Sequence, residues 1–305
     1  MNLLHAVSAP GRYLRRLPAN LVAALLMIAA FVIFSVMAVL ARQIGGHIPV
    51  IQMVLVRQVL AIALMAPLFW RMRALILSPR RLDLHAARGV SATGAMLCGL
   101  SAVLLIPLAD ATAIQMAEVL FATAFAALFL GERVGWRRWS ATAVGFVGVA
   151  IMVRPFGGGL ELNALVALFG ALCGAANMII LRVGAEYDRT ETVLFWQGLV
   201  ILVLVTPPAL WFWVTPTPFD WLILVAMSLI FTAGIWLFTT ALRMGETSAL
   251  APLNYLRLIL MALIGWAIYG EAPTLASAAG AILVLAAATN AMYETAQTAP
   301  RPDGD

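Results

Sequence analysis

Long apolar runs are the feature of this sequence that most restricts its fold. Of the 305 residues, 63% are hydrophobic and only 11% are charged, whereas close to half of an ordinary soluble domain is apolar. A helix of about 20 apolar residues crosses the hydrocarbon core of a bilayer. The sequence therefore predicts an all-α integral membrane protein with ten transmembrane helices, at residues 19–41, 50–70, 89–106, 111–130, 136–153, 162–181, 192–214, 219–242, 247–269 and 274–293.

The arginines predict how these helices are oriented. They gather in the N-terminal tail and in every second loop, most densely at residues 71–88, while the loops on the opposite side hold only Arg42 and Arg154. Loops with an excess of basic residues remain on the cytoplasmic side, so both termini are expected to be cytoplasmic. Attraction to anionic membrane lipid at that face accounts for the net charge of +5, and no nucleic-acid partner is expected.

The chain also carries an internal duplication. The expected helices at 111–130 and 247–269 are both followed by Gly-Glu, and a shift of 139 positions superposes these two ends. The same shift aligns scattered residues in four successive helices of each half. Because five helices are an odd number, the second half must enter the membrane from the opposite side. Such a 5+5 inverted repeat is typical of secondary transporters, whose substrate site lies near the midplane between the halves.

The duplication divides the chain into four parts. Residues 1–18 are expected to form a cytoplasmic tail, 19–153 the first five-helix repeat and 162–293 the second. Residues 294–305 are polar and contain two prolines. A segment of that composition buries too little apolar surface to fold, so a disordered cytoplasmic tail is expected there.

Three stretches of sequence carry a family resemblance. LFLGERVGWRRW at 128–139 and AIYGEAPT at 267–274 close the fourth and ninth helices, and PLADATA at 107–113 leads into the fourth. In these features the chain resembles the EamA-type branch of the drug/metabolite transporter superfamily. The resemblance implies a carrier for a small metabolite such as an amino acid, a nucleobase, riboflavin or S-adenosylmethionine, moved inward by some members and outward by others. Where this family usually has a proline in these two helices, the chain has Val119 and Leu258.

Each of the duplicated helices carries a polar pair. Gln115 and Glu118 align with Asn254 and Arg257, so one half supplies an acid and the other a base. A charge near the bilayer centre costs about 2.5–3.5 kcal/mol or more, so it should face a cavity or a partner. Either the two charges pair, and hold the halves together or lock a gate, or they contact substrate. An unpaired Glu118 would be the best proton carrier in the chain, so coupling to a proton is left open.

Five weaker candidates complete the predicted site. Arg57 adds positive charge that would suit a substrate with a carboxylate or phosphate, unless its side chain reaches the outer interface or a helix end. Asn177 either contacts substrate or forms an interhelical hydrogen bond. Trp196, Trp236 and Tyr255 either stack on a planar substrate or pack between helices.

Other residues have structural interpretations. Glu132 and Glu271, at the ends of the duplicated helices, are expected to hold loops or neighbouring arginines, and Gly170 and Gly174 permit a close helix contact. Tryptophans near the expected helix ends should form an interfacial belt; they are Trp136, Trp139, Trp211, Trp213 and Trp221.

The remaining composition limits the classes of function that the chain can have. The three histidines, His5, His47 and His85, fall in the tail or in expected loops, so no catalytic or metal site built on histidine is predicted. We therefore expect a secondary active transporter that moves a small organic metabolite by alternating access across the bacterial cytoplasmic (inner) membrane. It would work in contact with membrane lipid, as a monomer or homodimer and without a cofactor. A channel-like facilitator is the alternative, although the selectivity filter or ring of like charge that channels use is missing from the sequence. An intramembrane enzyme is a distant third.

Overall fold

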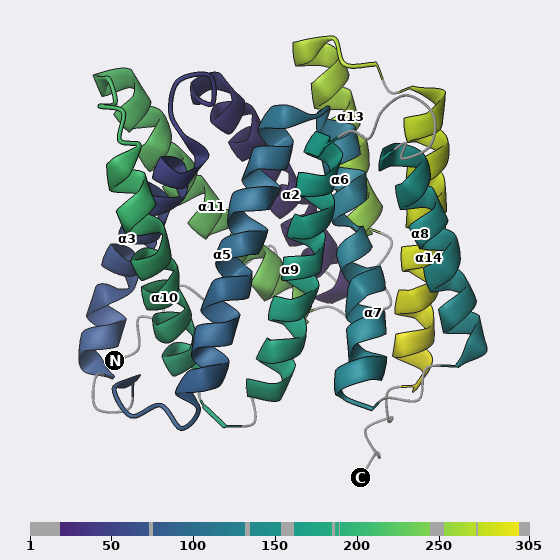
Figure 1. The fold of residues 1–305 in the computed structure, drawn as a ribbon, viewed down its shortest axis with the longest axis horizontal. Helices are drawn as coiled ribbons and strands as arrows, with labels where there is room; N and C mark the ends of the chain where they lie inside the picture. The colour runs from purple at the N-terminus through teal and green to yellow at the C-terminus, as the bar shows by residue number, and fades with distance from the viewer. Residues whose placement is uncertain are drawn as a thin grey trace.

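The computed structural model describes residues 19–72, 76–131, 135–153, 162–184, 187–188, 190–244, 253–272 and 274–298. Throughout these residues the secondary structure is helical, without a β-strand (Figure 1). The helices are α2 (Ala19–Ile44), α3 (Val50–Arg71), α5 (Leu82–Leu105), α6 (Leu108–Gln115), α7 (Ala117–Phe129), α8 (Trp136–Val153), α9 (Leu162–Gly184), α10 (Thr190–Trp211), α11 (Pro218–Met244), α13 (Asn254–Tyr269) and α14 (Leu275–Thr298).

Each predicted span coincides with a helix, and α6 and α7 together occupy the fourth. Seven of the described spans, counting α6 with α7, are long and apolar enough to cross a bilayer. The other three contain shorter apolar helices at Trp139–Met152, Leu256–Tyr269 and Ser277–Ala287. An all-helical, multi-pass membrane protein is thus observed, as the apolar runs predicted.

Most helix boundaries lie within about three residues of the prediction, but the start of α5 and the end of α14 differ by more. The third helix was expected to begin at residue 89, but α5 begins at Leu82, so His85 and Arg88 are helical and only 4% and 8% exposed. A hydropathy pattern assigns charged residues to loops. In the structure, however, the ring of His85 is within hydrogen-bond distance of Asp188, which lies in the connection between α9 and α10, so this turn can be helical and buried. At the other end, α14 continues to Thr298, past the expected start of a disordered tail at residue 294.

The most extensive contacts between helices are symmetric between the two halves. The most extensive contacts join α5 to α9, α2 to α11 and α8 to α14. Each helix of the first half has a counterpart 139 positions later, and exchanging all counterparts converts the α5–α9 contact into the α11–α2 contact. The α8–α14 and α3–α10 contacts convert into themselves. Connections alternate between the two ends of the bundle, so that α2 and α9 run in opposite directions (Figure 1).

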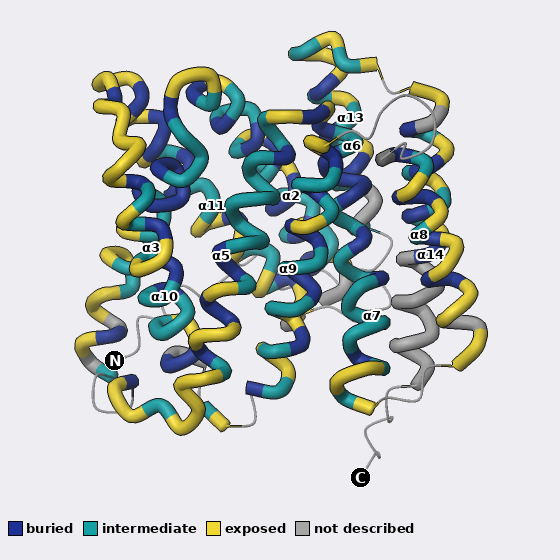
Figure 2. Tube along the Cα trace, viewed as in Figure 1, coloured by how far each residue is buried: buried dark blue, intermediate teal, exposed yellow. Residues whose placement is uncertain are grey.

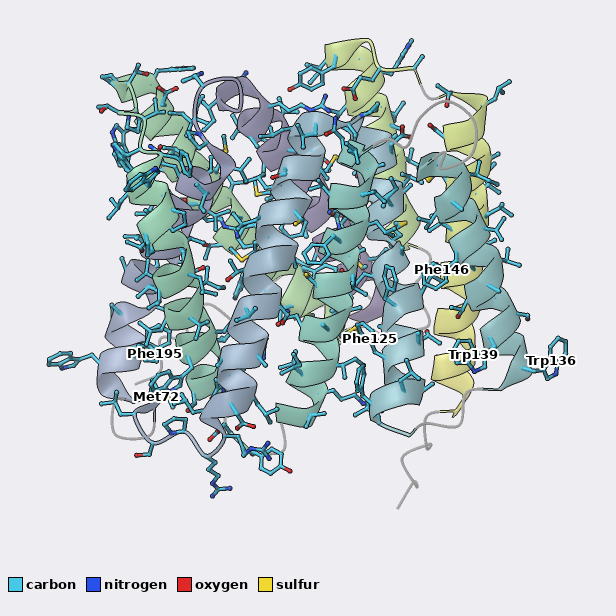
Figure 3. All side chains as sticks on the ribbon, viewed as in Figure 1. Met72, Phe125, Trp136, Trp139, Phe146 and Phe195 are labelled. Carbon is cyan, nitrogen blue, oxygen red and sulfur yellow. The ribbon has the colours of Figure 1, made fainter. Side chains whose placement is uncertain are left out.

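The outer surface is apolar, as a membrane requires. Exposed positions lie along the length of the helices (Figure 2), and many of them are large hydrophobic residues. Soluble proteins rarely expose apolar surface on this scale. Trp70, Trp136 and Trp211 are 73%, 76% and 84% exposed at helix ends. Figure 3 shows Trp136 projecting outward from the start of α8, close to Trp139. These positions fit an interfacial aromatic belt.

Candidate functional site

The fourth span is interrupted in its middle, where the predicted polar pair lies. The N–H of Met116 donates to the carbonyls of Thr112 and Ala113, both at 3.2 Å, and the N–H of Val119 donates to the carbonyl of Met116 at 3.2 Å. The bonds from Met116 to Ala113 and from Val119 to Met116 span three residues, so they tighten the helix for one turn between α6 and α7. Such a turn inside a helix often marks a hinge.

Gln115, the last residue of α6, connects three helices across the two halves. Its Nε2 donates to the Gly99 carbonyl of α5 at 3.3 Å. Its Oε1 accepts from Nη2 of Arg257 on α13, also at 3.3 Å. The amide therefore joins the first half of the chain to the second near the middle of the fourth span.

Glu118 lies against α9 through a glycine. A methyl group in place of the hydrogen of Gly174 would lie 2.8 Å from Cδ of Glu118, so only glycine leaves room for the carboxylate there. Gly170, one turn earlier, brings α9 against α5, where a methyl group would lie 3.1 Å from Cβ of Cys98. The close helix contact predicted for this glycine pair is confirmed, and it forms one wall beside Glu118.

Of the two alternatives for Glu118 and Arg257, a direct salt bridge is not found among the described residues, although the two charges are close enough to attract each other. The hydrogen bond that Arg257 donates goes to Gln115. The reason lies in the direction of the helices. The helices α6 and α13 run antiparallel (Figure 1), and the symmetry axis that relates the two halves passes between them. Gln115, the first residue of its polar pair, therefore faces Arg257, the second residue of the other pair.

Two buried polar atoms near this link lack a partner in the part of the chain that the structure describes. They are Nε of Arg257 and Oδ1 of Asn177, which lies one turn after Gly174 on α9. Gln115, Glu118, Asn177 and Arg257 are all half-buried rather than sealed. Unsatisfied buried polar atoms are few in proteins and call for an explanation such as a ligand or an ordered water.

The side chain of Arg57 lies inside the bundle and reaches neither the outer interface nor a helix end. Its guanidinium lies over the ring of Phe231 on α11, 4.3 Å from the ring centroid. Its Nη2 is buried and lacks a hydrogen-bond acceptor among the described residues. The ring face of Phe231 therefore stabilises the positive charge that the sequence analysis placed in the second span.

The aromatic candidates do not gather around this site as far as they are described. Nε1 of Trp196 donates to the carbonyl of Ile76 at 2.9 Å, which ties α10 to the connection between α3 and α5. Trp196 therefore anchors a loop. Trp236 is 48% exposed on α11. The side chains of Asn254 and Tyr255 lie outside the described part of the structure.

An ion pair that the sequence did not single out as a site closes one end of the bundle. Arg42, at the end of α2, pairs with Glu271, which follows α13. Arg42 also donates to the carbonyl of Val103 at 2.6 Å, and Glu271 accepts from the N–H of Leu108 at 2.9 Å. The prediction that Glu271 holds a neighbouring arginine is confirmed; Glu132 lies outside the described residues. A cavity of about 450 Å³ opens above the pair, lined by Arg42, Gly45, Gly46, Leu104, Leu105, Ile106, Pro107, Tyr269 and Glu271.

A second inter-half contact lies at the other end, where α5 begins. Nε2 of His85 lies 3.0 Å from Oδ2 of Asp188, and the two side chains are only 4% and 7% exposed. The N–H of Arg80 also donates to this carboxylate, at 3.1 Å. The sequence analysis assigned His85 to a loop, so this contact was missed.

The Asp188 contact predicts how stability depends on pH. Burial raises the pKa of Asp188, but hydrogen bonds from the Arg80 N–H and from His85 outweigh it and hold the pKa below its usual value. A carboxylate with a lowered pKa stabilises the fold above its ordinary pKa of about 4, and this contribution is lost as the pH falls further. We expect the melting temperature of Asp188→Asn to lie below that of the wild type at pH 6. The gap should narrow as the pH falls from 5 to 3 in detergent solution; a widening gap would contradict this assignment.

Comparison with known proteins identifies the family. The model of the EamA-like transporter family matches residues 21–154 and 162–292. The chain belongs to this family. A crystal structure of a protein 20% identical to the chain shares its fold, with a TM-score of 0.59 over 88% of this chain and 96% of that one.

Named relatives of this EamA-family chain are transporters. An S-adenosylmethionine uptake transporter from Rickettsia bellii is 29% identical over 61% of this chain, and the match spans 64% of that relative, less than two thirds of its length. A pseudopaline exporter from Pseudomonas aeruginosa is 28% identical over 86% of this chain and 93% of its own length. A riboflavin transporter from Rhizobium johnstonii is 35% identical over 66% and 65%. The family description and the names of these relatives are all those of transporters.

Proposed function

We propose that this EamA-family chain is a secondary active transporter that carries a small organic metabolite across the bacterial cytoplasmic membrane by alternating access. The observation that carries the proposal is the polar link between the halves, in which Arg257 donates to Gln115 at 3.3 Å. Polar groups at this depth are costly and usually mark a substrate or ion pathway. The unpartnered atoms of Arg257 and Asn177 beside the link are available to a substrate.

The proposed architecture is ten transmembrane helices in two inverted repeats, residues 19–153 and 162–293, with both termini cytoplasmic. The symmetric helix contacts support it, because exchanging the halves reproduces the most extensive contacts between helices. Two halves with equivalent packing can exchange their conformations. Such an exchange would turn a site between them from one face of the membrane to the other.

Contacts between the two halves at both ends of the bundle must change during such a transport cycle. Arg42 and Glu271 join the first half to the second at one end, and His85 and Asp188 do so at the other. The tightened turn at Met116 lies between these ends, directly beside the polar link. We infer that it is the hinge about which Gln115 and Glu118 move relative to Arg257.

Counterflow in proteoliposomes tests the proposed function. Vesicles containing the purified chain are loaded with unlabelled S-adenosylmethionine, riboflavin or an amino-acid mixture, and the matching labelled compound is added outside. We expect saturable accumulation of label for at least one compound, driven by exchange, and none in protein-free vesicles. Flux that rises linearly with concentration and is independent of the loaded compound would indicate a channel. Failure to exchange any of the compounds would count against the transporter proposed here.

A further inference from the structure

The carboxylate of Glu271 occupies a site that the first half of the chain builds. One of its oxygens accepts from Nη1 of Arg42, and the other accepts from the N–H of Leu108 at 2.9 Å, at the start of α6. A guanidinium beside a helix N-terminus suits a carboxylate, because both present N–H donors and positive charge. Arg42 and Leu108 belong to the first half and Glu271 to the second, so one half presents this carboxylate to the other.

The donors of this site are fixed independently of Glu271. Nε and Nη2 of Arg42 donate to the carbonyls of Val103 and Ile106, at 2.6 and 2.5 Å, where α5 ends. Both bonds lie within the first half, so they hold the plane of the guanidinium whatever the second half does. Withdrawal of Glu271 therefore leaves a guanidinium and a helix N–H together without an anion. A largely buried charge without its partner is costly, which favours a free carboxylate in its place.

The cavity at this end of the bundle gives a free carboxylate a route to the site. Its volume of about 450 Å³ lies within the range of small-molecule sites, and Arg42 and Glu271 both line it. Apolar and aromatic side chains supply further walls, from Leu104, Leu105, Ile106, Pro107 and Tyr269. A carboxylate attached to an apolar or aromatic body matches both the charged pair and these walls.

We propose that Arg42 and the N–H of Leu108 form a binding site for the carboxylate of a small organic acid, and that Glu271 keeps this site closed by occupying it. A free carboxylate competes with Glu271 for the same donors, so its binding releases the contact between the halves at this end. The polar link at Gln115, near the middle of the fourth span, is a separate site. This inference rests on the proposed transport function and names its substrate class.

Benzoate and benzamide test the inference, because they share a shape and differ in charge. The melting temperature of the purified chain in detergent is measured against the concentration of each compound, at neutral pH and constant ionic strength. We expect benzoate to raise it, since a ligand of the folded chain stabilises that chain, and benzamide to leave it unchanged. Arg42→Gln should abolish the benzoate shift. Glu271→Gln should instead bind benzoate about tenfold or more tightly than the wild type, because the competing carboxylate is removed.

Opposite responses from the two members of one ion pair separate a ligand site from a purely structural contact, and two further variants serve as controls. Gly46 lines the cavity, and a methyl group there would meet no atom within 4 Å. Gly46→Leu should therefore keep the fold, fill the cavity and abolish the benzoate shift, and it decides the matter if Arg42→Gln does not fold. The exposed control Arg81→Gln should retain the shift.

Three results would overturn the inference. They are an equal shift with benzamide, a benzoate affinity that Glu271→Gln does not increase, and a benzoate shift that survives Arg42→Gln or Gly46→Leu. Counterflow that continues under any of these results would preserve the transport function and remove only the carboxylate site. Benzoate binding that follows the expected pattern in a chain without counterflow would keep the site and remove the transport function.

Discussion

Exchanging Arg257 for glutamine is expected to abolish most transport while leaving the melting temperature unchanged or slightly higher. The side chain is half-buried, its Nε has no acceptor, and it is bound to a neutral amide at 3.3 Å. Burial of the guanidinium outweighs its attraction to the carboxylate of Glu118, so its charge adds little to the folded state. A hydrogen bond to a charged group is worth about 1.5–3 kcal/mol, so loss of such a bond to substrate should lower exchange by roughly tenfold to a hundredfold.

Counterflow rates and melting curves of the same preparations measure both effects. Arg257→Lys is the matched control: it keeps the charge but loses the planar donor geometry, and it should retain an intermediate rate. The exposed Arg81→Gln should resemble the wild type in both measurements. A fall of several degrees in the melting temperature of Arg257→Gln, with transport reduced only in proportion to the folded protein, would assign Arg257 a purely structural role.

The position of Arg257 relative to Glu118 and Gln115 shows which features of the site the sequence predicts and which require coordinates. Apolar runs and a repeat predicted the spans and located Gln115, Glu118 and Arg257, because a polar residue inside a membrane helix stands out against its neighbours. The choice of partner depends on the axial register of two antiparallel helices. A shift of one turn replaces Glu118 with Gln115 opposite Arg257, and the repeat alone does not determine that shift.

The contacts at the ends of the bundle were invisible for a different reason. His85 and Arg88 lowered the local hydropathy, so the expected third helix began too late, although burial and the contact with Asp188 make this turn part of α5. Arg42 was counted only as a marker of loop orientation. Its role depends on Glu271, 229 positions away in the sequence, and long-range partners of this kind require coordinates.

The Arg42–Glu271 pair is placed where two helix ends need opposite charges. Arg42 donates to the Val103 and Ile106 carbonyls, at 2.6 and 2.5 Å, where α5 ends. Glu271 accepts from the N–H of Leu108 at 2.9 Å, where α6 begins. Cations are favoured at helix C-termini and anions at N-termini, so each member of the pair complements a helix end as well as its partner. Since Arg42 belongs to the first half and Glu271 to the second, the pair fastens the halves together.

Removing either member of this pair is expected to destabilise the protein measurably. The two side chains are 12% and 21% exposed, so each single substitution leaves a largely buried charge without its partner. Arg42→Gln and Glu271→Gln should each cost about 2–3 kcal/mol, which corresponds to a fall of roughly 4–10 °C in the melting temperature. The double variant should lose less than the sum of the two, because neither unpaired charge remains.

A double-mutant cycle on melting temperature measures this coupling, and the chain contains its own control. Arg81 and Asp83 form an ion pair whose side chains are 44% and 61% exposed, and exposed pairs contribute little because water screens them. The cycle on Arg81→Gln and Asp83→Asn should therefore show no coupling. Additive losses at Arg42 and Glu271 would mean that the two charges act separately on their own helix ends. Coupled losses, together with counterflow that falls in the double variant despite its recovered stability, would identify the pair as a contact that the transport cycle itself uses.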